Sequence, residues 1–313
     1  MVRVLIIGAS GFIGPRVAVA LREAGHEVWS ASRNGAGVNG LALDRGDPSA
    51  ASAAVRTYRI ERVIDLIAYD AKSTASLLEA LDGSIERYVL ASSGDVYRNY
   101  EGLHRRASPP IDQSRLAEDS PLRTTRYPYR LSEPRSTDDP NQWLDDYDKI
   151  EVEAQLVARP SLSGVIVRLP MVYGPGDHQR RFRWILKALQ NGVAIEAPGD
   201  WLNWRTSYGF VDDVASALAL AATHDDAGGR AFNVGDIDPP SHREWIALFA
   251  KALGKREVVR KIPMHPDSPL AALDLRYPLV LDTTVIRTVL GWSESTGLMD
   301  ALARTAADER PRG

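Results

Sequence analysis

The chain has 313 residues, of which 44% are hydrophobic and 25% are charged, as in an ordinary globular protein. Its 38 Lys and Arg and 41 Asp and Glu residues give a net charge of −3, so no nucleic-acid partner is expected. Cysteine is absent and the six histidines show no metal-ligand spacing, which argues against disulfides, a thiol nucleophile and a metal site. We find no signal peptide and no apolar run of membrane-spanning length, and therefore expect a cytoplasmic protein with no membrane partner.

The N-terminal stretch organises the rest of the chain. Residues 2–7 form an apolar run, a turn with glycines at positions 8, 11 and 14 follows, and residues 15–24 have a helical pattern. Such a strand, glycine-rich turn and helix bind dinucleotides, because free N–H groups at the helix N-terminus face the pyrophosphate. A purely structural glycine turn is the alternative. The predicted cofactor contacts in this turn are Gly8, Ser10, Gly11, Phe12, Ile13 and Gly14.

The end of the second strand indicates which dinucleotide is bound. The strand predicted over residues 27–31 ends in Ser32 and Arg33, with no acidic residue. An acidic residue there would bind the 2′-hydroxyl of NAD, whereas an arginine accommodates the 2′-phosphate of NADP. We therefore expect NADP as the cofactor, with NAD as the alternative; Arg33 as a solvated surface residue is the other interpretation.

Strands and helices then alternate along the chain. Further strands are predicted over residues 40–43, 62–68, 87–91, 165–169 and 232–235. Helices are predicted over residues 50–59, 74–81, 143–159, 182–191, 212–223, 241–253 and 283–290. Residues 98–140 show little periodicity and are interpreted as an irregular cover over an active site.

This order predicts an α/β fold, a Rossmann-type doubly wound parallel sheet with a smaller C-terminal α/β lobe. We assign residues 1–174 to an NAD(P)-binding domain, to which residues 207–235 return, and residues 175–206 and 236–313 to a substrate-binding lobe. Ligands bind at the carboxyl ends of parallel strands. The cofactor contacts predicted from this rule are Asp44, Arg45, Ile67, Ala68 and Pro170.

Several separated motifs agree with one another. They are the turn at residues 8–14, Asp44, the Ser-Ser-Gly-Asp-Val-Tyr segment at 92–97, Lys149 with Glu153, and the segments at 168–177, 211–215, 232–235 and 290–292. As a set they resemble the extended short-chain dehydrogenase/reductase superfamily, in its NAD(P)-dependent epimerase/dehydratase group. The resemblance implies an NAD(P)-dependent oxidoreductase or epimerase/dehydratase. It also implies a homodimer, since many relatives pair through helices that flank the sheet.

The resemblance further implies a Ser or Thr after the fifth strand and a Tyr-x-x-x-Lys pair on one helix. In that pair the lysine binds the nicotinamide ribose and lowers the pKa of the tyrosine, which is the general acid/base. Ser93 and Lys149 match, but Asp145 stands at the tyrosine position. Tyr147 is two residues from Lys149, and on a helix these side chains would point to nearly opposite sides. Asp145 and Tyr147 are both catalytic candidates, with an exposed Asp145–Lys149 pair as the alternative.

Other polar groups complete the candidate site. Further hydroxyls that are candidates for proton transfer, with packing as the alternative role, are those of Tyr69, Tyr97, Tyr127 and Tyr129. The predicted substrate contacts are Ser93, Asp95, Tyr129, Tyr173 and Arg205. Arg205 lies about one residue out of register with the arginine that often holds a substrate phosphate in the family.

We predict an NADP(H)-dependent oxidoreductase acting on a small carbonyl, alcohol or sugar-derived substrate. Intact cofactor motifs together with Ser93 and Lys149 favour this function. Two alternatives remain open. One is a non-redox NADP(H)-binding or regulatory protein, suggested by the missing tyrosine. The other is a nucleotide-sugar epimerase or dehydratase with tightly bound NAD.

Overall fold

The computed structural model of the chain describes residues 1–309. Its centre is a seven-stranded sheet with the strand order β10-β6-β5-β4-β1-β2-β3, and all neighbouring strands run parallel. The strands of this sheet are β1 (Arg3–Ile7), β2 (Glu27–Ser32), β3 (Leu41–Ala42), β4 (Arg62–Asp65), β5 (Arg87–Ser93), β6 (Ser163–Leu169) and β10 (Arg230–Asn233). The predicted α/β fold with a doubly wound parallel sheet is confirmed.

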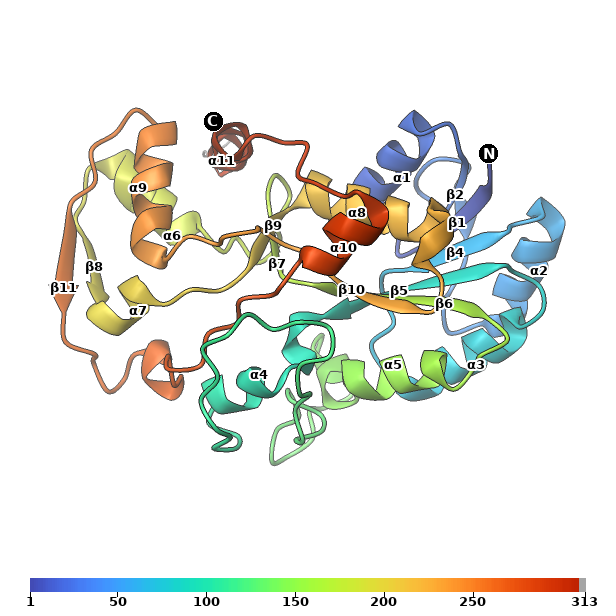
Figure 1. Ribbon diagram of the computed structural model, residues 1–313, viewed down its shortest axis with the longest axis horizontal. Helices are drawn as coiled ribbons and strands as arrows, with labels where there is room; N and C mark the ends of the chain where they lie inside the picture. The colour runs from blue at the N-terminus through green and yellow to red at the C-terminus, as the bar shows by residue number, and fades with distance from the viewer. Residues whose placement is uncertain (310–313) are drawn as a thin grey trace.

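Helices cover both faces of the sheet (Figure 1). They are α1 (Gly14–Glu23), α2 (Pro48–Tyr58), α3 (Ala71–Leu81), α4 (Arg98–Leu103), α5 (Lys149–Val157), α6 (Arg183–Asn191), α7 (Gly199–Asn203), α8 (Val211–Thr223), α9 (His242–Ala252), α10 (Thr284–Leu290) and α11 (Leu298–Asp308). Within residues 1–309 no helix has both the length and the apolar character that crossing a membrane requires.

The side chains of β1 show why both faces are covered. Val4 and Ile6 belong to the core that includes α1 and α8, whereas Leu5 and Ile7 belong to the core that includes α2, α3 and α5. Successive side chains of a strand point to opposite faces. An uninterrupted apolar strand therefore needs helices on both sides, which is the arrangement of a parallel sheet.

The smaller lobe lies at one end of the molecule, on the left in Figure 1. Its strands β8 (Ile195–Pro198) and β11 (Val259–Ile262) pair in parallel, and α6, α7 and α9 pack beside them. A second short pair, β7 (Met171–Tyr173) with β9 (Tyr208–Phe210), leads from the sheet towards this lobe. Helix α10 packs against α8 and β10, so this part of the segment 236–313 lies at the large sheet.

Two expected elements differ from the structure. The helix expected over residues 143–159 is interrupted: a turn of 3-10 helix spans Gln142–Asp145, and α5 begins only at Lys149. Asp148 causes this start, because its carboxylate caps α5 by accepting the Ile150 N–H at 3.0 Å. The cover at residues 98–140 is not wholly irregular, since it begins with α4. A helix of six residues is too short to produce a visible periodicity.

Candidate active site

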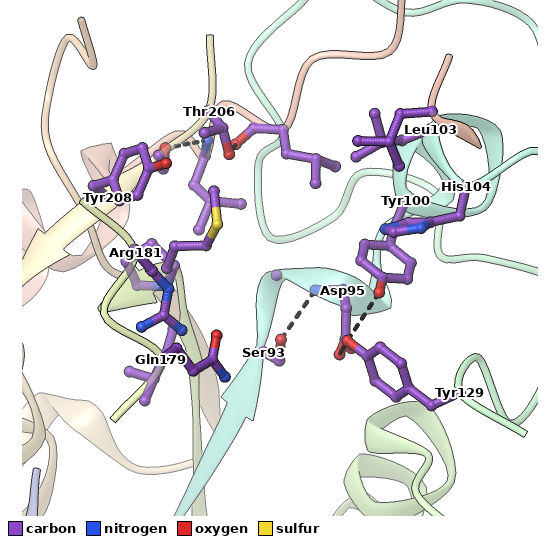
Figure 2. A pocket seen from close by; sticks show the side chains of 18 of the residues that line it. Ser93, Asp95, Tyr100, Leu103, His104, Tyr129, Gln179, Arg181, Thr206 and Tyr208 are labelled. Carbon is purple, nitrogen blue, oxygen red and sulfur yellow. Dashed lines mark hydrogen bonds between the residues drawn. The ribbon is translucent and has the colours of Figure 1, made fainter. Parts of the chain in front are cut away.

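Catalytic candidates from separate elements lie at the carboxyl edge of the large sheet. Ser93 ends β5, Asp95 lies in the turn of 3-10 helix that follows (Gly94–Val96), and Lys149 begins α5. This edge borders a cavity of about 880 Å³ whose wall includes residues of both lobes. In Figure 2, Asp95 lies on one side of the cavity and Arg181 on the opposite side. The position is the one at which parallel α/β sheets bind ligands.

The glycine-rich turn fits a dinucleotide. Gly8 has a φ of +87°, and a Cβ at this position would lie 2.9 Å from Ile67 Cγ2. A Cβ at Gly14 would lie 2.6 Å from Ala9 Cα, so only glycine allows α1 to pack this closely. Ile13 precedes α1 without a side-chain cap. The first N–H groups of the helix therefore remain available to a phosphate, as the sequence predicts.

Two arginines lie near the expected adenosine site, and they differ in how far protein groups already occupy their guanidinium donors. Arg45 is buried, and its guanidinium donates to Asp65 at 2.8 Å, Ser73 at 2.6 Å and Thr74 at 2.9 Å. Protein groups take three of the five N–H donors of this guanidinium, and the expected contact of Arg45 with a cofactor stays a prediction. Arg33 is exposed directly after β2 and makes no hydrogen bond or ion pair with the described residues.

The other predicted cofactor contacts lie along the same edge. Ser32 is buried at the end of β2, and Asp44 is exposed and accepts the Gly46 N–H at 2.8 Å. Ala68 follows β4 and accepts a hydrogen bond from Lys149, whereas Pro170 lines the cavity. Their roles toward a dinucleotide remain predictions.

Lys149 is held in a buried position between two strands. Its ammonium donates to the carbonyl oxygens of Ala68 and Ala91, both at 2.7 Å, and only 4% of the residue is exposed. Burial lowers the pKa of Lys149 from 10.5 to about 8, although Asp65 and Asp95 oppose this shift. An ammonium has three donors, so one remains for a ribose hydroxyl.

Tyr147 lies in the site although the helical spacing argued against it. It precedes α5, so the expectation that it points away from Lys149 is wrong: the Lys149 Nζ lies 5.8 Å from its ring centre. The Tyr147 hydroxyl donates to Asp95 Oδ2 at 2.8 Å. Burial and then the charge of Asp95 raise the pKa of Tyr147 well above 10, although a hydrogen bond with Ser93 opposes them. The phenol therefore keeps its proton at neutral pH, contrary to the lowered pKa that the resemblance implied.

Asp145 does not share the site with Tyr147. It lies in the turn Gln142–Asp145, where its carboxylate pairs with the Arg135 guanidinium and accepts the Arg135 backbone N–H at 2.7 Å. It is not among the described residues that line the cavity. The Asp145 carboxylate therefore holds the cover in place through Arg135, and it does not lie beside Tyr147 in the cavity wall.

Two predicted substrate contacts also lie elsewhere. Tyr173 is 1% exposed and packs against Phe182, Phe210 and Trp245 in the core. Arg205 donates to Glu244 at 3.0 Å outside the cavity. Neither belongs to the cavity wall as residues 1–309 define it, because β7 turns Tyr173 into the core and the N-terminus of α9 holds Arg205.

The tyrosines that were further candidates fall into two groups. Tyr69 and Tyr129 line the cavity, together with Tyr147. Tyr97 is fully buried and donates to Asn233 at 2.7 Å, so it serves the core. Tyr127 is not among the described cavity residues.

Most of the aromatic cavity wall was missed by sequence reasoning. The aromatic side chains that it adds are Trp143, Trp184, Trp201, Trp204, Tyr100, Tyr208 and His242. His242 stacks on Trp201 with ring centres 4.0 Å apart, and burial lowers its pKa to about 4, so it is neutral. The tryptophans at 201 and 204 are the one signal visible in the sequence, because the other aromatic residues come from helices and strands far apart along the chain.

The cavity wall carries little charge. Among the described lining residues, the carboxyl of Asp95 and the guanidinium of Arg181 are the two groups with a charged form at neutral pH. Arg181 is itself paired with Asp177 at 2.8 Å. The cavity is therefore an aromatic chamber without a cluster of cations.

Three of the relatives align with almost the whole chain, and two of them are named as reductases. The 3-diazoavenalumate denitrifying reductase of a Streptomyces species is 27% identical over 333 residues, covering 99% of this chain and 93% of the relative. The 2′-dehydrokanamycin reductase of Streptomyces kanamyceticus is 28% identical over 319 residues, covering 96% of this chain and 79% of the relative. These two identities show similarity to reductases but do not identify the substrate of this chain.

Solved structures with this fold support the architecture. A putative epimerase from Burkholderia cenocepacia superposes with a TM-score of 0.72 at 21% identity, covering 99% of this chain and 98% of that one. The UDP-glucose 4-epimerase of Thermus thermophilus, solved with NAD, gives 0.67 at 23% identity, covering 99% and 100%.

The sequence model of one protein family matches residues 4–235, from β1 to the turn after β10. This range contains the glycine-rich turn, Ser93, Tyr147 and Lys149. The expected activity class, an NAD(P)-dependent oxidoreductase or epimerase/dehydratase, is confirmed at this level. The chain belongs to the NAD dependent epimerase/dehydratase family.

Proposed function

We propose that the protein is an NADP(H)-dependent reductase of a small, ring-shaped carbonyl compound that carries no nucleoside diphosphate. One observation carries this proposal: Tyr147 is a buried phenol that keeps its proton and lies in the cavity wall with Ser93. A phenol that holds its proton at neutral pH is in the protonation state that a reduction requires, in which a proton passes to the carbonyl oxygen.

Each residue has a defined task in this reaction. The Ser93 hydroxyl would hold the carbonyl oxygen, Tyr147 would give it a proton, and the third donor of Lys149 would hold the nicotinamide ribose. A reduced nicotinamide bound here supplies the hydride for the carbonyl carbon. Aromatic walls on the other sides of the cavity would orient the ring of the substrate and exclude water.

The preference for NADP rests on the end of β2. Arg33 is exposed there with a guanidinium that no described residue occupies, and the strand ends without an acidic side chain. A guanidinium binds phosphate oxygens through two parallel hydrogen bonds. Arg45 is less available for this role, because Asp65 and two hydroxyls occupy three of its five N–H donors.

The substrate class rests on the charge of the cavity. A nucleotide sugar brings a diphosphate, which proteins bind through several cationic or backbone donors. Within the described residues, the cavity wall supplies one guanidinium, Arg181, and Asp177 already pairs with it. Arg205, the expected phosphate ligand, lies outside the cavity. Two of the three relatives that align with nearly the whole chain are named as reductases, whereas the third is named as a dTDP-6-deoxy-L-talose 4-dehydrogenase.

A cofactor titration tests the NADP assignment. We expect NADPH to bind about tenfold more tightly than NADH, which corresponds to roughly 1.4 kcal/mol for one phosphate contact. Arg33→Ala should remove this difference, and the matched surface change Arg22→Ala should keep it. Reduced-nicotinamide fluorescence gives both dissociation constants. Equal binding of the two cofactors by the unchanged protein would contradict the assignment.

Turnover tests the reaction itself. NADPH oxidation is followed with a panel of aromatic and alicyclic aldehydes and ketones, and the alcohol product is identified by mass spectrometry. We expect at least one ring-shaped carbonyl to be reduced. Tightly bound NAD in the purified protein together with interconversion of UDP-sugars would instead establish an epimerase.

A further inference from the structure

Two phenol hydroxyls converge on one buried carboxyl at the cavity wall, and a third phenol joins them through one of the two. Tyr147 donates to Asp95 Oδ2 at 2.8 Å, and Tyr129 donates to the same oxygen at 3.2 Å. Tyr100 donates to the Tyr129 hydroxyl at 2.9 Å. In Figure 2 the labelled rings of Tyr100 and Tyr129 both lie beside Asp95. The hydrogen bonds therefore form a continuous path from Tyr100 to Tyr147.

The path reaches an exposed part of the cavity wall. Tyr100 belongs to α4, and the ring of His104 lies 4.3 Å from its ring. His104 lines the cavity and is exposed, whereas Tyr100 is 8% exposed and Tyr147 is 7% exposed. The Tyr100 end of the path thus lies beside an exposed side chain of the cavity wall, where the relay would take up its proton.

The carboxyl at the centre is unusual because half of it has no partner. Asp95 is 5% exposed, and its Oδ1 makes no hydrogen bond within residues 1–309. An ionised carboxylate in such a place loses the hydration of its Oδ1, which no described group replaces. Burial raises the pKa of Asp95, although the nearby cations Arg123 and Lys149 and the two phenols lower it. The carboxyl therefore takes up a proton more readily than an exposed one does.

We propose that Asp95, Tyr129 and Tyr100 form a proton relay that reloads Tyr147 after each reduction, a role that rests on the function proposed above. When the carbonyl carbon accepts the hydride, the carbonyl oxygen takes the Tyr147 proton and leaves a phenolate. Asp95 gives its carboxyl proton to this phenolate. The carboxylate then takes the Tyr129 proton, Tyr129 takes that of Tyr100, and Tyr100 takes one from solution. The cycle consumes one hydride and one proton.

Removing a single hydroxyl can distinguish a proton relay from a purely structural contact. Tyr129→Phe keeps the ring, which packs on Tyr147 with centres 5.1 Å apart, but interrupts the path. The first two turnovers should then stay fast, because Tyr147 and Asp95 each already carry one proton in this scheme. Later turnovers should slow about 10²-fold, the lower end of proton-transfer contributions. Rapid mixing with excess NADPH and carbonyl substrate should therefore show a burst of two equivalents per site.

A second variant and a control complete the kinetic test. Asp95→Asn keeps the volume but cannot release a proton, so its burst should fall to one equivalent per site and its later turnovers should be slow. Tyr127→Phe removes a hydroxyl from the same cover that hydrogen bonds to no group within residues 1–309, and should behave as the unchanged protein. The solvent deuterium isotope effect on the steady-state rate of the Tyr129→Phe protein should increase, because proton delivery to Asp95 then limits turnover.

A readout without cofactor keeps this test separate from that of the proposed function. The infrared spectrum of the unchanged protein near neutral pH should contain a protonated-carboxyl band that Asp95→Asn lacks. Presence of this band supports the relay even if no carbonyl is found to be reduced. Absence of the band, an unchanged steady-state rate in Tyr129→Phe, or an equal slowing of its first and later turnovers would each overturn the proposal.

Discussion

The backbone conformation before α5 decides which of the two catalytic candidates, Tyr147 or Asp145, lies in the site. The family spacing places Asp145 four residues before Lys149, which would be the same helix face. In the structure both residues precede α5, and the turn Gln142–Asp145 directs Asp145 toward Arg135. Tyr147 instead reaches Asp95 at 2.8 Å. The spacing of residues in a sequence predicts which side chains are neighbours only if those residues form the helix that the spacing assumes.

This assignment predicts unequal effects of two substitutions. Tyr147→Phe should lower kcat for carbonyl reduction by about 10²–10⁴, the usual contribution of a positioned proton donor. Asp145→Asn should cost at most a few-fold, because it weakens only the ion pair with Arg135. Steady-state kinetics and NADPH binding should be measured for both, and binding should stay unchanged. A loss in Asp145→Asn as large as that in Tyr147→Phe would restore Asp145 as the proton donor.

At the scale of elements, the start of α5 decides the geometry of the site. Asp148 caps this helix and is 1% exposed as a side chain, and Arg123, 0% exposed, pairs with it at 2.5 Å. Arg123 also donates to the Asp95 carbonyl at 3.0 Å, and the Tyr127 N–H donates to Asp148 at 2.8 Å. One buried ion pair thus joins the cover, the end of β5 and the start of α5.

Breaking this pair should therefore destabilise the protein strongly. Arg123→Met leaves the buried Asp148 carboxylate without its cation, which costs about 3–5 kcal/mol in comparable cases. Arg126→Met is the matched control, because its pair with Glu151 is partly exposed and contributes less than about 1 kcal/mol. Urea unfolding gives both changes in the free energy of unfolding. Similar losses in the two variants would show that the Arg123–Asp148 pair has no special role.

The sequence predicts the elements of the sheet domain better than those of the cover. The turn at residues 8–14 is predictable because each glycine answers a local steric need, such as the 2.6 Å approach of a Cβ at Gly14 to Ala9. The start of α5 is not predictable in this way. It depends on Asp148 meeting Arg123, which is 25 residues away in sequence. Long-range ion pairs leave no periodic signal.

At the scale of the whole molecule, the parallel sheet follows from the alternation of strands and helices, but the cavity does not. Its wall joins Tyr69 after β4 and Trp143 in the cover to Trp201 in α7 and His242 in α9. Each of these aromatic residues is consistent with core packing when the sequence is considered alone. The substrate chamber therefore becomes visible only when the two lobes are placed together.

The low charge of this chamber leads to a prediction for the whole molecule. A ligand that binds only the folded state raises its free energy of unfolding, by about 2.7 kcal/mol at 100 times its Kd. NADPH should produce this stabilisation, because the glycine-rich turn and Lys149 belong to the folded sheet domain. UDP-glucose should leave the melting temperature unchanged, with or without NADPH, because the cavity has one paired guanidinium for its diphosphate within the described residues. Thermal unfolding measures both effects. A clear rise with UDP-glucose would show that diphosphate donors form elsewhere, and the protein would then have to be treated as a nucleotide-sugar enzyme.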